Sequence, residues 1–386
     1  MRNRYLDLLR AAAVVRVVVY HVTGLAALTI LLPAMSVMFA LAGSLMAASV
    51  DRFGVSAIGR RMRRLLPSLW GVMALFLPVM LATGLGWDWR ILFWAAPFID
   101  PPANGFGLAA LSANWYLRDF LWFVALSPVV LPIFRRFPLP TLAAPFVLLI
   151  ATELKLVTID NYVLRDIGMY FGAWMLGFAH HDGMLRRLTW RRLVPLAAVL
   201  AVAGAAWIIT HPGPRGYDLN DIRIGNALWS AAFVLIALGL APDSLPWLSR
   251  RPRLDRVVTL LNSRALTIYL WHVPIIVGVG WVALHYGWPQ TGALAISVKL
   301  AVVLAGVALA VMAFGWIEDV AAKRRPQLFP GLVPAKRLLP DPPRLAYPAL
   351  AALEPAEERR GQARGQVTEE VLVSRGQEAQ VAALRA

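Results

Sequence analysis

The chain contains no cysteine among its 386 residues. Disulfide bonds, thiolate metal sites and a cysteine nucleophile are therefore excluded. Charged residues are also scarce, at 16% of the sequence, whereas soluble domains carry about 25%. The six histidines are too scattered to indicate a zinc site, so no metal is expected. No segment with a signal-peptide cleavage site precedes the first apolar run, and we expect that run to be kept as a membrane helix.

Hydrophobic residues make up 59% of the chain, and the mean hydropathy is +0.62. This composition predicts an integral membrane protein whose partner is the lipid bilayer. The formal charge of +16 does not indicate nucleic acid. A nucleic-acid binder gathers lysine and arginine on one solvated face, whereas here they fall in short clusters between apolar runs.

Ten apolar runs are long enough to cross a bilayer, which takes about 17 to 25 residues in an α-helix. The predicted fold is therefore an all-α membrane domain of about ten transmembrane helices. The segment 90–112 is interrupted by proline and glycine, and we expect an interfacial or re-entrant loop there. The ten predicted spans are 6–28, 30–49, 67–86, 115–134, 140–157, 164–180, 193–210, 225–241, 265–285 and 294–316.

Basic residues lie on one side of this arrangement. Alternate connections carry clusters such as "GRRMRR" at 59–64, "RRLTWRR" at 186–192 and "RRPRLDR" at 250–256, and the other connections carry only scattered basic residues. Because lysine and arginine are retained in the cytoplasm, both termini are predicted to be cytoplasmic, in a multi-pass protein of the cytoplasmic membrane. Residues 1–320 form the predicted membrane domain. Residues 321–386 are rich in proline and charge, which predicts a disordered cytoplasmic tail.

The first predicted span carries four ionisable residues. Arg10 and His21 are eleven positions apart, which is three helical turns plus roughly 20°, so they share one face. Asp7 lies on the same side, and Arg16 lies on the opposite side. Such a same-face series in a membrane helix favours a site or pathway over a structural hydrogen bond. For Arg16 we expect a structural ion pair with an acidic residue of another helix.

Five motifs resemble the acyltransferase 3 family of membrane acyltransferases, whose typical opening is close to "LDGLRGIAALLVVLYH". The first is "YLDLLRAAAVV" followed by "VVYH", which keeps the spacing of Arg10 and His21. The others occur in the family's order. They are "FALAGSLM" at 39–46, "RRMRRLLPSLW" at 60–70, "NWYLRDFLWFVALSP" at 114–128 and "NSRALTIYLWHVPII" at 262–276.

The resemblance implies transfer of an acyl group, often acetyl, from cytoplasmic acyl-coenzyme A to a hydroxyl of a carbohydrate or other acceptor of the envelope or of secondary metabolism. The donor is a substrate, and no bound cofactor is implied. Imidazole has a pKa of about 6.5, which suits a general base. His21 is therefore the catalytic candidate, either as base or as a transient acyl carrier.

The donor's phosphates favour arginine at the cytoplasmic mouth of the site. The candidates for acyl-coenzyme A binding are Arg10, Arg60, Arg61, Arg63 and Arg64. For the last four, membrane topology alone is an equally good explanation. The supporting candidates are Asp7, Trp115, Tyr269 and His272. For Trp115 an anchor at the membrane interface, and for His272 a structural hydrogen bond, stay open.

Two positions depart from the family pattern. Ala42 replaces the serine of the second motif, and Arg118 and Asp119 stand where many members carry an acid in another register. No second catalytic acid is assigned for that reason. The alternative function is a transporter or flippase-like protein for a polar envelope precursor, which would spread polar residues along several helices. Acidic residues inside the predicted spans are few, chiefly Asp7, Asp119 and Glu153.

Overall fold

The computed structural model describes residues 3–158 and 161–328. Within these residues the fold is all-helical, without a β-strand, as the composition and the apolar runs predicted. Residues 329–386 of the predicted tail lie outside the described residues, and so do residues 1 and 2.

Each of the ten predicted spans overlaps a helix of the structure. The ten are α1 (Arg4–Thr23), α3 (Ala34–Phe53), α4 (Ser56–Ala82), α6 (Trp115–Arg136), α7 (Pro138–Glu153), α8 (Tyr162–His181), α10 (Trp190–Thr210), α11 (Arg223–Gly239), α14 (Ala265–His285) and α15 (Ala293–Phe314). The shorter elements are α2 (Ala27–Leu31), α5 (Gly105–Ala110), α9 (Met184–Arg187), α12 (Pro246–Ser249), α13 (Pro252–Ser263), α16 (Trp316–Ala321), and the 3₁₀ turns η1 (Trp89–Trp94) and η2 (Ser112–Asn114).

Six helices of the described chain are long and apolar enough to cross a membrane. Four of them are α4, α10, α14 and α15. The other two are α3 taken together with α2, and α6 taken together with η2. Helices α7 and α11 have 16 and 17 residues, which gives a length of about 25 Å against a hydrocarbon core of about 30 Å. Helix α1 carries Asp7, Arg10 and Arg16 along its length. The count of ten spans therefore stays a prediction.

The ends of α1 have clear local causes. The Asn3 side chain accepts hydrogen bonds from the amides of Tyr5 and Leu6, and so caps the first turn. Gly24 has a φ of +66°, and its amide donates to the Tyr20 carbonyl, which is the left-handed conformation that ends many helices. The helix therefore stops at Thr23, five residues before the predicted end, and α2 follows as a separate short helix.

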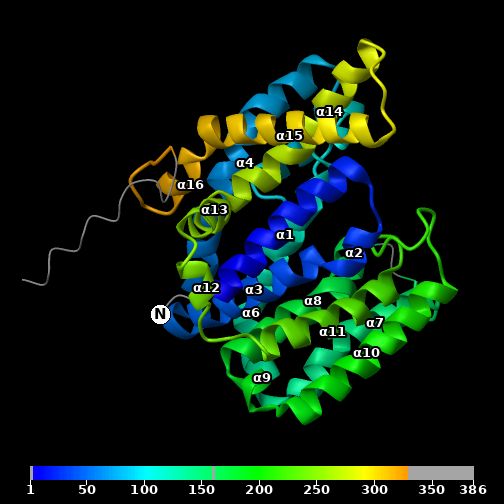
Figure 1. The fold of residues 1–386 in the computed structure, drawn as a ribbon, viewed down its shortest axis with the longest axis vertical. Coiled ribbons are helices and arrows are strands. Elements are labelled where there is room, and N and C mark those ends of the chain that lie inside the picture. Colours follow the sequence, from blue (N-terminus) through cyan, green and yellow to red (C-terminus); the bar gives the residue numbers. More distant parts are fainter. Residues whose placement is uncertain (1–2, 159–160, 329–386) are drawn as a thin grey trace, which may run out of the picture. The chain divides into compact units, whose positions relative to one another are not determined.

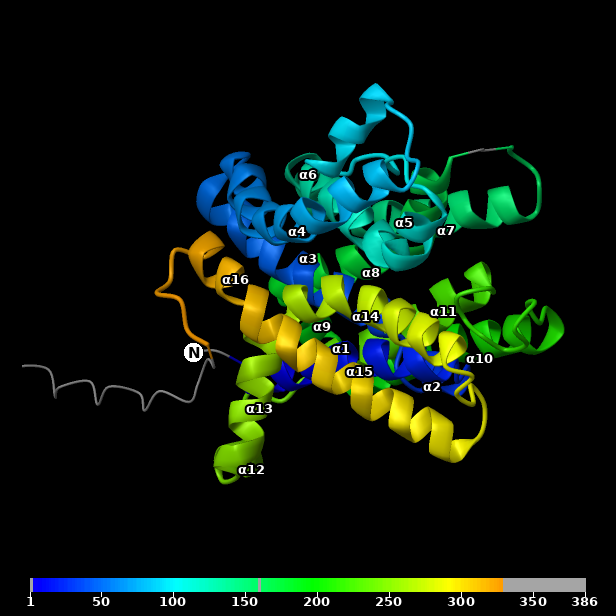
Figure 2. The ribbon, with the colours of Figure 1, turned by 90° about the horizontal axis from the view of Figure 1, so that it is seen from above.

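Helix α1 lies between α3 on one side and the pair α14 and α15 on the other (Figure 1). Helices α7, α8, α10 and α11 form a second group beyond α3, which Figure 2 shows from above. Aromatic side chains fill the core between these helices. Phe39 of α3 contacts Phe123 of α6 and Tyr170 of α8, with ring centroids 4.8 and 5.4 Å apart.

Helices α3 and α8 approach each other through glycine. A Cβ atom on Gly43 would collide with the Trp174 carbonyl, and one on Gly177 would collide with the Ala40 carbonyl. Small residues allow such backbone contact between membrane helices. Ser44 and His180 add a side-chain hydrogen bond of 3.0 Å across the same contact. We call this contact the α3–α8 seam, and it joins the middle of α3 to the second half of α8.

The segment 90–112 contains no spanning helix, as expected, but it is well packed. Trp94 and Ile91 are buried against α4, and the Trp122 indole donates to the Phe98 carbonyl at 2.7 Å. The basic stretch 59–64 differs from the prediction. It forms the first turns of α4 rather than a loop, because that helix begins at Ser56.

Reporter fusions check the predicted orientation. Because basic clusters alternate between connections, we expect cytoplasmic signals after Gly54, Phe137, Leu188 and Arg250, and external signals after Gly86, Val157, Gly216 and Trp288. A fusion pair of alkaline phosphatase and green fluorescent protein at each position distinguishes the two sides. Two or more reversed positions would contradict the arrangement of ten spans.

Candidate functional site

His21 lies in the last turn of α1, where its ring is exposed to a cavity of about 390 Å³. The cavity wall draws on helices that are far apart in the sequence. Besides His21, it includes Arg16 and Tyr20 of α1, Trp115 at the start of α6, Asp166 of α8 and Tyr269 of α14. This volume falls in the range of about 300 to 1,000 Å³ that is usual for small-molecule sites. Three of the predicted site residues, His21, Trp115 and Tyr269, therefore meet at one cavity.

The His21 imidazole has a defined hydrogen-bonding pattern. Its Nδ1 atom lies 2.8 Å from the Val17 carbonyl oxygen, one turn earlier in α1. A carbonyl can only accept a hydrogen bond, so Nδ1 must carry the proton. In the neutral ring, Nε2 then has a free lone pair. The ring can therefore take a proton from a hydroxyl group in the cavity.

His272 lies directly against His21. The two ring centroids are 4.9 Å apart, with an interplanar angle of 70°. His272 is fully buried, and its Nδ1 atom lies 2.5 Å from the Tyr269 carbonyl oxygen. Its Nε2 atom has no hydrogen-bond partner among the described residues. One nitrogen thus makes the expected structural bond, while the other is a buried acceptor that is left unsatisfied at a usual cost of about 1–3 kcal/mol.

Trp115 and Tyr269 are both held in the cavity wall by contacts with other helices. Trp115 stacks on Tyr170 of α8 with a centroid distance of 5.4 Å and an angle of 24°. The Tyr269 hydroxyl donates to the Ala113 carbonyl at 2.8 Å and so ties α14 to the start of α6. Both rings are packed on other side chains rather than projecting from the fold. Their positions fit a rigid cavity wall.

Asp7 and Arg10 lie near the other end of α1 and do not line this cavity. Asp7 is buried and pairs with Arg4 at 2.9 Å, and Arg4 also bonds Asp255 of α13. The Asp7 carbonyl accepts a 2.7 Å hydrogen bond from the Asn262 side chain. Asp7 therefore contributes to the contact that joins α1 to α13. The helical rise separates it from His21 by roughly 20 Å along the axis.

The four α4 arginines are also outside the cavity, and they differ in their contacts. Arg61 donates to the Leu45 carbonyl at 2.7 Å and to the Ser49 hydroxyl at 3.1 Å. Arg60 stacks on the Phe53 ring at 4.0 Å, and Arg63 bonds the Gly59 carbonyl of its own helix. Arg61 is near enough to interact electrostatically with both Arg10 and Arg64. Arg10, Arg61 and Arg64 thus form one basic cluster, which we call the arginine cluster.

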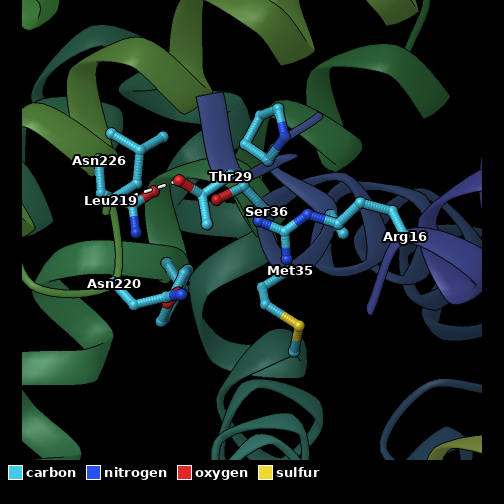
Figure 3. Close-up of a pocket in the computed structure, with 10 residues that line it drawn as sticks. Arg16, Thr29, Met35, Ser36, Leu219, Asn220 and Asn226 are labelled. Carbon is cyan, nitrogen blue, oxygen red and sulfur yellow. Dashed lines mark hydrogen bonds between the residues drawn. The ribbon is translucent and has the colours of Figure 1, made fainter. Parts of the chain in front are cut away.

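Arg16 corrects the sequence interpretation. It is buried, with 9% of its surface exposed, but it makes no ion pair among the described residues. Its Nε atom donates to the Leu28 carbonyl at 2.9 Å, and its guanidinium lies 4.8 Å from the Tyr20 ring centre. Figure 3 shows the side chain extending toward Met35 and Ser36 in a small recess. Its length lets it reach the His21 cavity although the two residues lie on different faces of α1.

A comparison with protein-family models identifies the family of this chain. The model described as acyltransferase domain, of the acyltransferase 3 type, matches residues 3–316. The chain belongs to this family. Neither the curated proteins nor the solved structures contain a match to it. The apolar helices and the family together fit a membrane-type acyltransferase. Its five motifs fall on α1, α3, α4, α6 and α14, and the first, fourth and fifth of these helices supply His21, Trp115 and Tyr269 to the cavity.

Several residues that shape the cavity of this acyltransferase were not predicted. Tyr20 lies next to His21, and its hydroxyl donates to Asp218 at 2.5 Å and accepts from Arg215 at 2.9 Å. Arg215 in turn pairs with Asp221 at 2.7 Å. The hydrogen bond from Arg215 holds the pKa of Asp221 below its usual range. Asp221 therefore stays charged at neutral pH, and its stabilising effect is lost only when the pH falls through that lowered pKa.

A buried arginine lies within the fourth motif. Arg118 is 3% exposed and bonds three carboxylates, those of Asp119 at 3.0 Å, Asp100 at 2.5 Å and Asp166. Asp166 also lines the cavity, whereas Asp119 is buried with one oxygen unpaired among the described residues. Asp166 is thus the carboxylate that the fold brings to the His21 cavity. Asp166 lies inside the predicted span 164–180, and an acid within an apolar run is the signal that could have found it.

A second group of ionisable side chains lies apart from the cavity. Ligand atoms of Asp51, His181 and Asp182 approach within 4.8 Å of one another, which is a spacing that suits a metal ion. Arg135 already bonds both carboxylates, at 2.7 and 2.6 Å. His181 also contacts Asp51 at 2.9 Å, so the carboxylates already have partners at the protein surface, and we assign no metal site to the cluster.

Proposed function

We propose that this acyltransferase moves an acyl group, in the first instance acetyl, from acyl-coenzyme A to a hydroxyl of a carbohydrate or similar envelope acceptor. The observation that carries the proposal is the His21 ring at the cavity wall. Its Nδ1 is held by Val17 and its Nε2 lone pair is free. Acyl transfer to a hydroxyl needs such a base, because a neutral hydroxyl is a weak nucleophile.

In the direct route, Nε2 of His21 takes the proton of the acceptor hydroxyl while the oxygen attacks the thioester carbonyl carbon. The carbon–sulfur bond then breaks, and the coenzyme A thiolate takes the proton from the imidazolium. In the two-step route, Nε2 attacks the thioester carbon first, and the carbon–sulfur bond breaks to release coenzyme A as the thiolate. The acyl-imidazolium then passes its acyl group to the hydroxyl oxygen, and the hydroxyl proton goes to the thiolate. Both routes yield an ester and free coenzyme A, and both return His21 to its neutral form.

His272 is proposed as the residue that positions His21. The two rings meet edge to face at 4.9 Å, and the Nδ1 bond of His272 to Tyr269 fixes its own orientation. A ring that is fully buried cannot turn freely, so it limits the rotation of its neighbour. Holding the catalytic base in one orientation lowers the entropic cost of reaching the transition state.

The arginine cluster is proposed to bind the phosphates of coenzyme A. Arg61 stays anchored on α3 through Leu45 and Ser49, and Arg10 lies within its electrostatic range. In the predicted topology this end of α1 faces the cytoplasm, where the donor is found. The axial distance from Arg10 to His21 is about 16 Å, which the flexible pantetheine arm of the donor would bridge. A transporter is less well supported, since the family match indicates an acyltransferase.

Purified protein incubated with labelled acetyl-coenzyme A and an extract of envelope glycans tests the proposal. We expect free coenzyme A to be released and acetyl groups to appear on glycan hydroxyls, as detected by mass spectrometry. Acid quenching without acceptor would trap label on His21 only if the two-step route operates. If folded protein releases no coenzyme A and no glycan gains mass, the proposed activity is wrong.

A further inference from the structure

Arg16 is a buried cation that makes no ion pair with another described residue. The residue is 9% exposed, and apart from the Nε bond to Leu28 its side chain donates no hydrogen bond among the described residues, so both terminal NH₂ groups are available to a ligand. A buried charge without a partner is costly, so native proteins usually pair it. Such a group in a cavity wall favours the binding of an anion.

The other charged groups at the cavity already have partners. Arg215 pairs with Asp221, Arg223 pairs with Glu153 at 2.7 Å, and Asp166 is bonded by Arg118. Asp218 accepts from Tyr20 and lies 3.5 Å from Arg215, and it attracts Arg16 electrostatically without forming an ion pair with it among the described residues. Arg16 is therefore the arginine of the cavity lining that has no direct ion-pair partner within the described part of the chain.

A recess beside the guanidinium completes an anion site. It is lined by Arg16, Thr29, Met35, Ser36, Leu219 and Asn220, among others, and Figure 3 shows the Arg16 side chain reaching into it. Its volume of about 10 Å³ suits a single oxygen-sized group. The Ser36 hydroxyl is 1% exposed and makes no hydrogen bond with another described residue. A guanidinium and a free hydroxyl together suit one oxygen of a carboxylate or phosphate.

We infer that the acceptor of this acyltransferase carries a carboxylate or phosphate group that Arg16 binds while the acceptor hydroxyl faces His21. Arg16 and His21 line the same cavity of about 390 Å³, so one small molecule can contact both. The inference rests on the proposed function, since it names the class of its acceptor.

Arg16 makes a better anion ligand than the arginine cluster would for the same acceptor. The cluster lies at the opposite end of α1, about three turns from His21. A bidentate arginine bond to a carboxylate or phosphate fixes orientation as well as position. The acceptor would thus be held at one end by its charge, and its hydroxyl would reach Nε2 of His21.

Three sugars that share one ring test the inference by binding alone. They are methyl glucoside, its 6-carboxylate (methyl glucuronide) and its 6-phosphate. Dissociation constants for the full-length protein in detergent, measured by ligand-observed NMR, do not depend on turnover. Charged hydrogen bonds usually improve affinity by about tenfold to a hundredfold, so we expect at least one anionic sugar to bind that much more tightly than the neutral one. Which one does so distinguishes carboxylate from phosphate.

The Arg16→Gln variant should lose this preference, and Arg16→Lys should keep part of it. Arg90→Gln is the matched control, because Arg90 is an exposed arginine paired with Asp88 outside the cavity. The preference should survive in the control. Equal affinity for all three sugars, a lack of binding by all three, or a preference that persists in Arg16→Gln would each overturn the inference. If Arg16→Gln does not fold, the wild-type comparison and Arg16→Lys still decide.

Transfer measurements separate this inference from the proposed function. With acetyl-coenzyme A as donor, Arg16→Gln should raise the KM for the anionic sugar about tenfold to a hundredfold and leave the KM for the donor unchanged. A raised donor KM instead would assign Arg16 to coenzyme A and overturn the inference. Transfer to all three sugars with equal efficiency would leave the acyltransferase activity standing while removing the anionic acceptor.

Discussion

Replacing His21 by alanine should lower the turnover of acyl transfer by about a hundredfold to ten-thousandfold, the usual range for loss of a general base. The ring sits on the surface of the cavity, and its Nδ1 bond goes to a carbonyl of its own helix. Its removal therefore leaves no buried partner unpaired on another helix. Protein yield and acyl-coenzyme A binding should stay close to those of the wild type.

His211→Ala provides the matched control. His211 also lies at the end of a helical segment, and its Nδ1 atom contacts the carbonyl of Trp207 one turn earlier at 3.2 Å. It is exposed and stacks on Trp207, outside the His21 cavity. The two variants should be compared by coenzyme A release and by binding of a non-hydrolysable donor analogue. Full activity of His21→Ala would remove the catalytic role of this residue.

Arg118→Met should lower the free energy of unfolding by about 3–5 kcal/mol, as expected when one partner of a buried charge network is removed. Arg118 holds three carboxylates, and its removal leaves Asp119 buried beside Asp166 and Asp100 without a cation. Repulsion and desolvation then act together on the carboxylates. The measurement is the thermal transition of purified protein in detergent, followed by intrinsic tryptophan fluorescence.

Arg90→Met is the control for this change. Arg90 makes a bonded pair with Asp88, as Arg118 does with its neighbours, but Arg90 is exposed and Asp88 is only partly buried. Exposed pairs contribute little to stability, so its transition should not move. Adding Asp119→Asn to Arg118→Met should recover part of the loss, because it removes one buried charge. An unchanged transition for Arg118→Met alone would show that the three carboxylates do not need the guanidinium.

Hydropathy located the helices because apolar runs in this chain leave few other ways to satisfy backbone hydrogen bonds. All ten predicted ranges overlap a helix. The boundaries were less accurate where polar residues are good helix formers. Helix α4 begins eleven residues before its predicted start, since the arginines of 59–64 continue the helix. Gly24 ended α1 early through its left-handed backbone.

Residues of the candidate site could be predicted from the sequence only where they lie within a recognisable motif. The motif that carries His21 and the one that carries His272 are far apart in the sequence, and the fold brings their rings to 4.9 Å. Helical periodicity placed Arg16 on the face of α1 opposite to His21, yet its side chain reaches the same cavity. A helical wheel gives the direction of the Cβ atom and not the reach of a long side chain. Asp166 and Arg215 were missed altogether, since their roles depend on pairings between α8, the loop before α11 and other helices.

The α3–α8 seam also sets the order in which the site can be assembled during synthesis. Ser44 and His180, which bond across it, are 136 residues apart in the chain. At a translation rate of about 5–20 residues per second, α3 waits roughly 7–27 s before α8 is made. During that interval the glycine face of α3 has no native partner and must be covered by lipid or by an insertion factor. His272 arrives later still, so the nascent protein carries His21 through most of its synthesis without the ring that completes the pair.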